Sequence, residues 1–400
     1  MIFAEPALGP EDSAVLSLIQ ALWAELRINL QHRPRRWSGL LARNLRARAI
    51  QGSNSIEGYV VSQEDALAAV DGDSPEEAAD DTWAAITGYR DALSYVLRLA
   101  DADDFAYDGN LLRSLHFMMC RHDPRSNPGT WRPGTIYVRN DATGEIVHEG
   151  PPRDQVPGLV RELCAALMER ESDAASRLVR AAMAHLNLVM IHPFSDGNGR
   201  MARCLQTLVL ARGGLLDPTF SSIEEYLGRN TRAYYDILAD VGGGRWSPRR
   251  DALPWVRFCL TAHYRQGMTA KRRLDAIADI GREVEAELVR VGLPDRAAVS
   301  LTNAALGHRL RNESYRRDAD VSLVVASRDL KSLVEAGLLV AHGANRGRSY
   351  EAGSWLAGLR ARFRDATPIP SPFDVLRTKG RSAASSSRRP KTRKRTGKKR

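Results

Sequence analysis

One short stretch of this 400-residue chain, HPFSDGNGRMAR, gathers side chains that suit phosphate chemistry. His192 follows a long apolar run, and its imidazole titrates near neutrality, as a general base requires. Asp196 offers a hard oxygen ligand for Mg²⁺, and Asn198 can donate a hydrogen bond within the loop. Arg200 and Arg203 are three residues apart on one helix face, where they could clamp phosphate oxygens.

The backbone of the same stretch predicts an anion site. Gly197 and Gly199 permit positive φ and a bare backbone, so the chain can turn tightly. A new helix is expected to begin around Gly199, and its first N–H groups and its dipole would attract a phosphate. Phe194 is expected to anchor the loop in the core. Each residue alone has an ordinary structural explanation, but the combined spacing favours a nucleotide site.

Helices must position this loop, and a hairpin interrupts them. Between Gly134 and Pro152, two β-prone runs flank a glycine-containing turn, which predicts a hairpin lying across the helical body. Apolar residues at helical spacing predict helices over 15–30, 82–99, 111–120, 156–168, 174–190, 200–212, 224–241 and 253–288.

The stretch from His192 to Arg203 matches the pattern H-x-F-x-(D/E)-G-N-G-R-x-x-R of the Fic family at every fixed position. The resemblance extends over roughly Trp83–Leu260 and includes the Gly-Thr-Trp-Arg run ending at Arg132. It implies an all-α Fic fold. It also implies, for most members, transfer of AMP from ATP to a Ser, Thr or Tyr hydroxyl.

The resemblance also implies roles for individual residues. His192 would deprotonate the incoming hydroxyl, and Asp196 would hold Mg²⁺ on the α- and β-phosphates. Asn198 and the loop amides would bind phosphate oxygens, while Arg200 would contact the β- and γ-phosphates and Arg203 the γ-phosphate. The nucleotide-binding set is then Phe194, Asp196, Gly197, Asn198, Gly199, Arg200, Arg203 and Tyr235.

Two further parts of the site rest on the same resemblance. The hairpin is similar to the family's flap, which registers the target backbone by strand pairing, here through Ile136, Tyr137 and Val138. Tyr235 is expected near the adenine.

Upstream, the run Ser-Asn-Ser-Ile-Glu-Gly that ends at Gly58 matches the pattern (S/T)-x-x-x-E-(G/N). One class of the Fic family carries this motif before its core and uses it as a brake. By that resemblance, Glu57 pairs with Arg203 and blocks the γ-phosphate position. The alternative is a helix end with an exposed Glu57 and a terminating glycine.

A smaller unit is expected after Gly292. A helix over Ser322–Leu339 followed by a glycine-rich β-prone run is the pattern of a winged helix-turn-helix. Its basic side chains would contact DNA phosphates, although winged helices also serve in dimerisation and protein docking. These side chains are Arg328, Lys331, Arg346 and Arg348.

Four regions follow from these patterns. They are an N-terminal helical region with the inhibitory motif (1–100), a Fic core (101–290), a winged helix-turn-helix domain (291–360), and a linker with a disordered basic tail (361–400). The last 24 residues hold 12 Lys or Arg and no acid, so a net charge of +10 becomes −2 over the first 376 residues. Such a tail would bind polyanions or serve only for solubility.

Composition limits the remaining possibilities. No stretch approaches the roughly 18 apolar residues of a membrane-spanning helix, and no secretory signal is expected. Four widely spaced cysteines lack metal spacing, which predicts buried thiols in a reducing, cytoplasmic compartment.

The sequence therefore favours a mainly α protein acting as an autoinhibited protein adenylyltransferase that uses ATP and Mg²⁺. A protein target and self-modification are expected, and a homodimer that controls access of Glu57 to Arg203 is conceivable. One alternative is a DNA-binding regulator whose Fic unit only senses nucleotide. Another is an enzyme of the same pocket that transfers UMP, phosphocholine or phosphate, or removes AMP.

Overall fold

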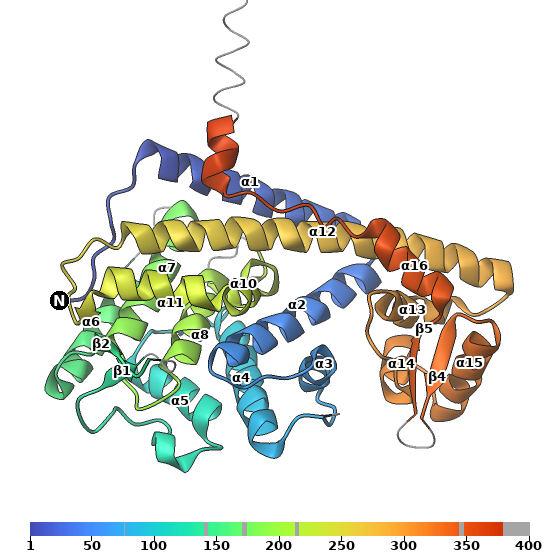
Figure 1. The fold of residues 1–400 in the computed structure, drawn as a ribbon, viewed down its shortest axis with the longest axis horizontal. Helices are drawn as coiled ribbons and strands as arrows, with labels where there is room; N and C mark the ends of the chain where they lie inside the picture. The colour runs from blue at the N-terminus through green and yellow to red at the C-terminus, as the bar shows by residue number, and fades with distance from the viewer. Residues whose placement is uncertain (76, 140–142, 170–173, 213–215, 344–347, 379–400) are drawn as a thin grey trace, which may run out of the picture.

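A computed structural model describes residues 1–378 apart from 76, 140–142, 170–173, 213–215 and 344–347. Helices dominate it, and α12 (Leu253–Val291) runs along nearly the whole length of the molecule (Figure 1). This helix has 39 residues and is therefore about 58 Å long. Most of the other helices pack below it as a larger body, and a smaller C-terminal unit lies under its far end.

The core of the larger body is the pair of consecutive helices that flank the predicted loop. Helix α7 (Ala174–Ile191) and helix α8 (Asn198–Ala211) pack against each other over most of their length. Trp255 of α12 is fully buried and donates its indole N–H to the Ala182 carbonyl of α7 at 2.7 Å. The surrounding helices are α1 (Pro10–His32), α2 (Arg35–Ile56), α3 (Gln63–Asp71), α4 (Asp80–Leu99), α5 (Gly109–Cys120), α6 (Val156–Met168), α9 (Pro218–Ser221), α10 (Glu224–Arg229) and α11 (Thr231–Gly242).

The predicted helices are found, with one correction. The single helix expected over 224–241 is broken at Asn230 into α10 and α11. Asn230 has φ −125° and ψ 36°, and its side-chain amide donates to the Tyr226 carbonyl at 2.8 Å. A side chain that bonds its own backbone competes with the helical ladder, so Asn230 ends one helix and begins the next.

The predicted hairpin is also found and belongs to a three-stranded sheet. Strand β1 (Tyr137–Arg139) pairs antiparallel with β2 (Ile146–Glu149), and Tyr137 lies opposite Glu149. Strand β3 (Gly244–Arg245) pairs parallel with the other edge of β2. The order β1-β2-β3 leaves β1 at the edge of this sheet.

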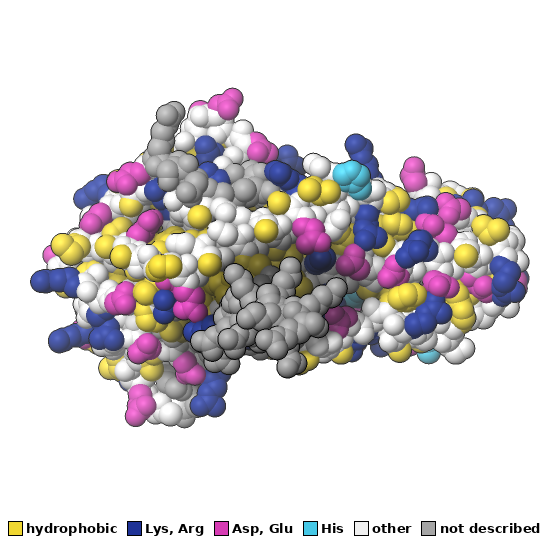
Figure 2. Space-filling model, turned by 90° about the horizontal axis from the view of Figure 1, so that it is seen from above, with side chains coloured by type: hydrophobic (Ala, Val, Ile, Leu, Met, Phe, Trp, Pro, Cys, Tyr) yellow, Lys and Arg dark blue, Asp and Glu magenta, His cyan; other side chains and the backbone are white. Residues whose placement is uncertain are grey.

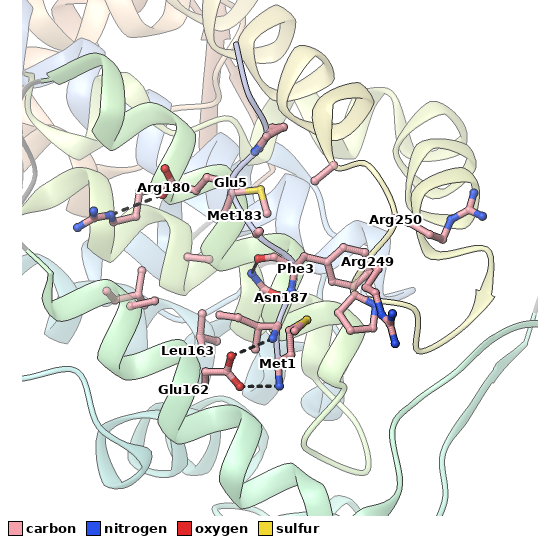
Figure 3. A pocket seen from close by; sticks show the side chains of 18 of the residues that line it. Met1, Phe3, Glu5, Glu162, Leu163, Arg180, Met183, Asn187, Arg249 and Arg250 are labelled. Atoms are coloured by element: carbon pink, nitrogen blue, oxygen red, sulfur yellow. Dashed lines mark hydrogen bonds and ion pairs between the residues drawn. The ribbon is translucent and has the colours of Figure 1, made fainter.

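The N-terminal residues form an extended arm that packs against a residue next to this sheet, Trp246. Phe3 is buried, its N–H donates to Oδ1 of Asn187, and its carbonyl accepts from Nδ2 of the same side chain. Its ring meets Trp246 edge-on at 5.6 Å, and the N–H of Trp246 donates to the Glu149 carbonyl of β2. Figure 3 shows Phe3 and Asn187 together in the cavity, of about 680 Å³, that this arm enters.

The C-terminal unit consists of helices followed by a hairpin. It contains α13 (Ala298–Ala305), α14 (Asn312–Ala319), α15 (Leu323–Glu335), β4 (Leu339–His342), β5 (Ser349–Ala352) and α16 (Ser354–Phe363). Ion pairs connect it to the N-terminal helices: Asp71 of α3 accepts from Arg43 of α2 and from Arg317 of α14. Its assignment as a winged helix-turn-helix remains a prediction.

Part of the predicted linker, which begins at residue 361, is helical. Helix α16 continues to Phe363, and residues 372–378 form another helical turn. Phe373 accounts for this turn, because its ring packs under the Arg257 guanidinium of α12 while Arg377 pairs with Glu11 of α1. The remainder of the predicted basic tail, 379–400, lies outside the described residues.

The described surface mixes both signs of charge. On the face seen in Figure 2, basic and acidic side chains are interspersed along the length of the molecule. All four cysteines are buried and unpaired, as predicted. Among the helices of the described chain, none combines the length and the apolar character needed to cross a bilayer.

Candidate active site

The candidate base lies where α7 ends. The N–H of His192 still donates to the Leu188 carbonyl at 3.0 Å, but its φ is +51°, in the left-handed region. Pro193 explains why the helix ends here, because the right-handed helical region is disfavoured for a residue before proline, but it does not itself favour a left-handed φ. A left-handed non-glycine residue costs on the order of 1 kcal/mol, so the surrounding contacts must hold it.

Hydrogen bonding fixes the state of the His192 ring. Its Nδ1 lies 3.1 Å from the Val189 carbonyl, which can only accept, so Nδ1 carries the proton and Nε2 keeps its lone pair. Burial lowers the pKa of His192 to about 4, and the bond to Val189 opposes this shift. The imidazole is therefore neutral at physiological pH, which is the form that can accept a proton.

The loop after Pro193 is closed by its own side chains. Oδ1 of Asn198 accepts from the Phe194 N–H, and its Nδ2 donates to the Phe194 carbonyl, both at 2.9 Å. Phe194 is buried and stacks on His116, with ring centroids 3.8 Å apart. His116 in turn donates from Nε2 to the Asp196 carbonyl and accepts the Gly129 N–H at Nδ1.

Both polar atoms of the Asn198 side chain bond within the loop, and its amide nitrogen carries a second N–H, so the expected contact with a phosphate stays a prediction. Phe194 is a core anchor, as expected. Gly197 has φ +73° at the start of α8, and a Cβ there would come within 2.7 Å of the Cys120 sulfur. The loop therefore needs glycine at 197 both for its conformation and for space.

Arg200 brings a buried positive charge under the loop. Its side chain is 1% exposed; Nη2 lies 3.6 Å from a carboxylate oxygen of Asp196 and 3.6 Å from the Cys120 sulfur. The Tyr59 ring covers the guanidinium at 5.2 Å. Its Nε and Nη1 are buried and have no hydrogen-bond partner among the described residues. Buried donors of this kind are satisfied in nearly all proteins, so an anionic ligand is expected there.

Arg203, one turn later, is held by α2. Its Nε donates to the Ser53 hydroxyl at 2.7 Å and its Nη2 to the Ser53 carbonyl at 2.9 Å. The same Nη2 donates to Oε1 of Glu57 at 2.6 Å. Nη1 of Arg203 is buried and has no partner in the described chain. The predicted contact between Glu57 and Arg203 is thus present, 146 positions apart in sequence.

Glu57 lies over the first turn of α8. A Cβ built on Gly199 would come within 2.3 Å of Oε1 of Glu57, so the carboxylate directly covers the backbone there. The first N–H groups of a helix lack internal partners and attract anions. Glu57 therefore stands where the anion site was predicted. Tyr235 contacts the same segment, because its hydroxyl donates to the Ile56 carbonyl at 3.1 Å.

Asp196 has the exposure that a metal ligand shared with a bound phosphate would need. Its side chain is 55% exposed at the mouth of the loop, beside the unsatisfied donors of Arg200. No cluster of three or more His, Cys, Asp or Glu occurs among the described residues, so an ion would depend on phosphate oxygens for most of its ligands. The donor set suits Mg²⁺ held jointly with a nucleotide.

The flap residues lie at the free edge of the sheet. Tyr137 is 46% exposed in β1, with Val138 next to it. Ile136 accepts the Gly150 N–H at 3.2 Å, which closes the base of the hairpin. The hairpin tip, 140–142, falls outside the described residues.

Sequence reasoning missed several residues that build this site. Arg132 belonged to the family resemblance and His116 to a predicted helix, but the spacing of neither residue indicated a role. Ser53 was named only as a position of the inhibitory motif, and Tyr59 was not considered. Each acts through a contact between segments far apart in the chain, which periodicity cannot reveal.

Comparison with known proteins agrees with this geometry. Residues 107–210 match the Fic/DOC family. This stretch forms a Fic domain. The crystal structure of a Fic family protein from Desulfovibrio desulfuricans G20 aligns with 88% of this chain and 99% of its own at a TM-score of 0.54, with 22% sequence identity. The structure of Fic-1 from C. elegans aligns with 67% of this chain and 73% of its own at a TM-score of 0.52, also with 22% identity.

Sequence relatives of the Fic domain carry a named activity. The protein adenylyltransferase Fic of Aedes aegypti is 30% identical over 191 residues, which are 48% of this chain and 33% of that protein. The protein adenylyltransferase fic-1 of Caenorhabditis elegans is 48% identical over 80 residues, 20% of this chain and 13% of the relative. The chain spans about a third of the length of the first of these curated relatives.

The contact between Glu57 and Arg203 predicts a change in nucleotide binding. In Glu57→Gly, Arg203 loses a hydrogen bond to a charged and partly exposed partner, so we expect the free energy of unfolding to fall by about 2 kcal/mol. A non-hydrolysable ATP analogue would supply the missing anion and raise the melting temperature more than it does in the wild type. Glu77→Gly, at a loop side chain 72% exposed, is the control. Equal shifts with the analogue in all three proteins would contradict this prediction.

Proposed function

We propose that this protein is an autoinhibited protein adenylyltransferase that transfers AMP from ATP to a Ser, Thr or Tyr hydroxyl of a protein. The observation that carries the proposal is a neutral His192, with its Nε2 lone pair available, near two buried arginines that each keep buried N–H groups without a hydrogen-bond partner among the described residues. The names of the sequence relatives support the reaction class.

The proposed reaction uses each group for what its position permits. His192 takes the proton of the target hydroxyl while the hydroxyl oxygen bonds to the α-phosphorus. The bond from that phosphorus to the bridging oxygen breaks, and pyrophosphate leaves with the electron pair. Arg200, Arg203 and the first amides of α8 hold the phosphate oxygens and neutralise their charge. When bound, Mg²⁺ would be held by Asp196 and would supply further charge neutralisation.

The target would dock on the flap. Strand β1 is the free edge of its sheet, since β2 is already paired on both sides. An extended segment of the target, or of a second copy of this chain in self-modification, would add a strand along Tyr137 and Val138. Main-chain pairing carries little sequence preference, so the target's identity would depend on side-chain contacts beyond this strand.

The resting state would be restrained by Glu57. Its carboxylate occupies one donor of Arg203 and covers Gly199, so a triphosphate could bind only with its γ-phosphate displaced. Tyr235 strengthens this arrangement by holding the Ile56 carbonyl, in addition to any contact with the adenine. Four buried thiols fit the reducing, cytoplasmic location that we also propose.

Label transfer tests the reaction and its donor. We expect Glu57→Gly to incorporate label from [α-³²P]ATP into itself at least 10-fold faster than the wild type, because Arg203 becomes free for the γ-phosphate. Glu57→Gly with His192→Ala should incorporate none. Transfer from [γ-³²P]ATP would indicate phosphoryl transfer, and release of AMP from modified protein would indicate the reverse reaction. Equal incorporation by wild type and Glu57→Gly would refute the brake.

The pH profile follows from His192. Its pKa is lowered to about 4, and the base works only when unprotonated, so activity is lost as pH falls through that value. We expect the kcat of Glu57→Gly at saturating ATP to change less than 2-fold between pH 8 and pH 6. An ordinary histidine with a pKa near 6.5 would lose most of its activity over the same range. A 10-fold loss by pH 5.5 would show that His192 is not buried in the active form.

A second, independent role in DNA binding is favoured by the surface of α15. Ala326, Leu330 and Leu333 of this helix are buried, while Arg328 and Lys331 are exposed three residues apart on its outer side. Arg348 is exposed and directly precedes β5 of the following hairpin. Arg346 lies outside the described residues. This face could lie in a major groove with the basic side chains on phosphates.

Mobility shift separates this helix from the basic tail. With a chain ending at Leu376, we expect Arg328→Glu with Lys331→Glu to weaken binding to duplex DNA at least 10-fold at fixed salt. Arg364→Glu, an exposed charge just after α16, is the control. If removing residues 377–400 alone abolishes the shift, the tail and not α15 binds the DNA.

A further inference from the structure

The end of α7 is held by residues that flank the flap. The last carbonyls of a helix have no partner within it, and the surroundings must supply donors. The Met190 carbonyl accepts from Nε2 of His148 at 2.9 Å. The His192 carbonyl accepts from Nε of Arg132, and the Pro193 carbonyl from the Arg132 N–H, both at 2.9 Å.

The same arginine also holds both roots of the hairpin. Nη1 of Arg132 donates to the Gly134 carbonyl, just before β1, and Nη2 donates to the Pro151 carbonyl, just after β2. One planar guanidinium thus joins three backbone segments: the base, the root of β1 and the root of β2. The fixed fork of an arginine, unlike a lysine ammonium, can bond three acceptors in one plane.

The setting of Arg132 is unusual for a charge. Its side chain is 1% exposed, and the hydrogen bonds found for its guanidinium all go to backbone carbonyls. Among the described residues no ion pair is found for Arg132, and burial alone lowers its pKa. A buried cation without a carboxylate is costly, so its hydrogen bonds to the three carbonyls must offset that cost.

The packing around the guanidinium leaves little room for adjustment. A Cβ built on Gly150 would approach the Ile136 side chain to 2.7 Å and Nη2 of Arg132 to 3.3 Å. The flap root, the guanidinium and the end of α7 are therefore in direct contact, and a shift in one must displace the others.

We propose that Arg132 is a positioning residue that sets the distance between the target-docking strand β1 and the base His192. The inference rests on the proposed function, because it concerns a target strand paired with β1. Such a strand takes its place from β1, and its hydroxyl must then come within hydrogen-bond reach of Nε2 of His192. Because Arg132 bonds to the root of β1 and to the His192 carbonyl, the fold sets the distance between them, whatever the target.

Arg132→Lys in the Glu57→Gly protein tests this role. Lysine keeps the charge but cannot bond three carbonyls in one plane, so a single side chain no longer holds both β1 and His192 in place. We expect kcat for self-modification to fall about 100-fold, while KM for ATP stays within 2-fold. Arg113→Lys is the matched control, since exposed Arg113 also donates to a backbone carbonyl, that of Gly129, without touching the flap. It should leave both constants unchanged.

Hydrogen–deuterium exchange gives a readout that needs no activity. In Arg132→Lys we expect faster exchange at the Gly150 amide, which bonds Ile136, and at the His192 amide in the last turn of α7. The Met201 amide of α8 should keep its wild-type rate. His148→Leu removes the other tie between β2 and α7, and should produce the same pattern with a smaller loss of kcat, even if Arg132→Lys fails to fold.

The outcomes distinguish a failure of the proposed function from a failure of the positioning role of Arg132. If Glu57→Gly transfers no label at all and the exchange pattern is as expected, the proposed function fails and the positioning by Arg132 stands. Unchanged kcat in Arg132→Lys, or unchanged exchange at Gly150 and His192, overturns the positioning role. A parallel loss in kcat and in ATP affinity, with faster exchange throughout α8, would also overturn it, because that is the result of a general structural defect.

Discussion

Two buried guanidinium groups, those of Arg200 and Arg203, impose the constraint on which the rest of this structure depends. Both side chains are 1% exposed, and each has buried N–H groups without partners in the described chain. A charge in such surroundings is tolerated only when an opposite charge or several acceptors face it. In the resting chain, Glu57 meets this need for Arg203, and Asp196 does so in part for Arg200. A bound triphosphate would offer acceptors to both, so under the proposed function the ligand and the Glu57 carboxylate would compete for the same donors.

These contacts depend on the position of α2. Its C-terminal end brings the Glu57 carboxylate to α8, and Ser53, Glu57 and Tyr59 contact the two arginines. Gly58, with φ +86°, turns the chain sharply enough for Tyr59 to cover Arg200 after Glu57 has reached Arg203. The C-terminal unit contacts the same N-terminal helices through Asp71, so it is joined to α2 and α3 as well as to α12.

A second set of contacts lies on the other side of the loop. The carbonyls at the end of α7 accept hydrogen bonds from Arg132, which precedes the flap, and from His148 of β2. The left-handed His192 is therefore supported by the same elements that would present a target. His192 and strand β1 are thus connected through Arg132, while Arg200, Arg203 and Glu57 form a separate group of contacts, and the two groups meet at the loop closed by Asn198.

Much of this site could be predicted from the sequence because its functional groups are adjacent in the chain. The glycines, the base and the arginines from 192 to 203 need only a helix, a turn and a second helix, and local spacing determines those. The hairpin was equally local. The break at Asn230 escaped periodicity because one side-chain hydrogen bond decided it, and helix α2 was not among the predicted helices. The contact of Glu57 with Arg203 was anticipated from a family motif and not from physics.

Tertiary structure alone decided how these groups are held. The sequence could not show that burial keeps His192 neutral, that the Asn198 amide closes the loop on Phe194, or that Arg132 joins the base to both flap roots. Each depends on which backbone carbonyls and side chains are brought together from segments tens to hundreds of residues apart. Residue types and spacing therefore determined what chemistry the loop can support, whereas packing determined the protonation state, the geometry and the restraint under which that chemistry would run.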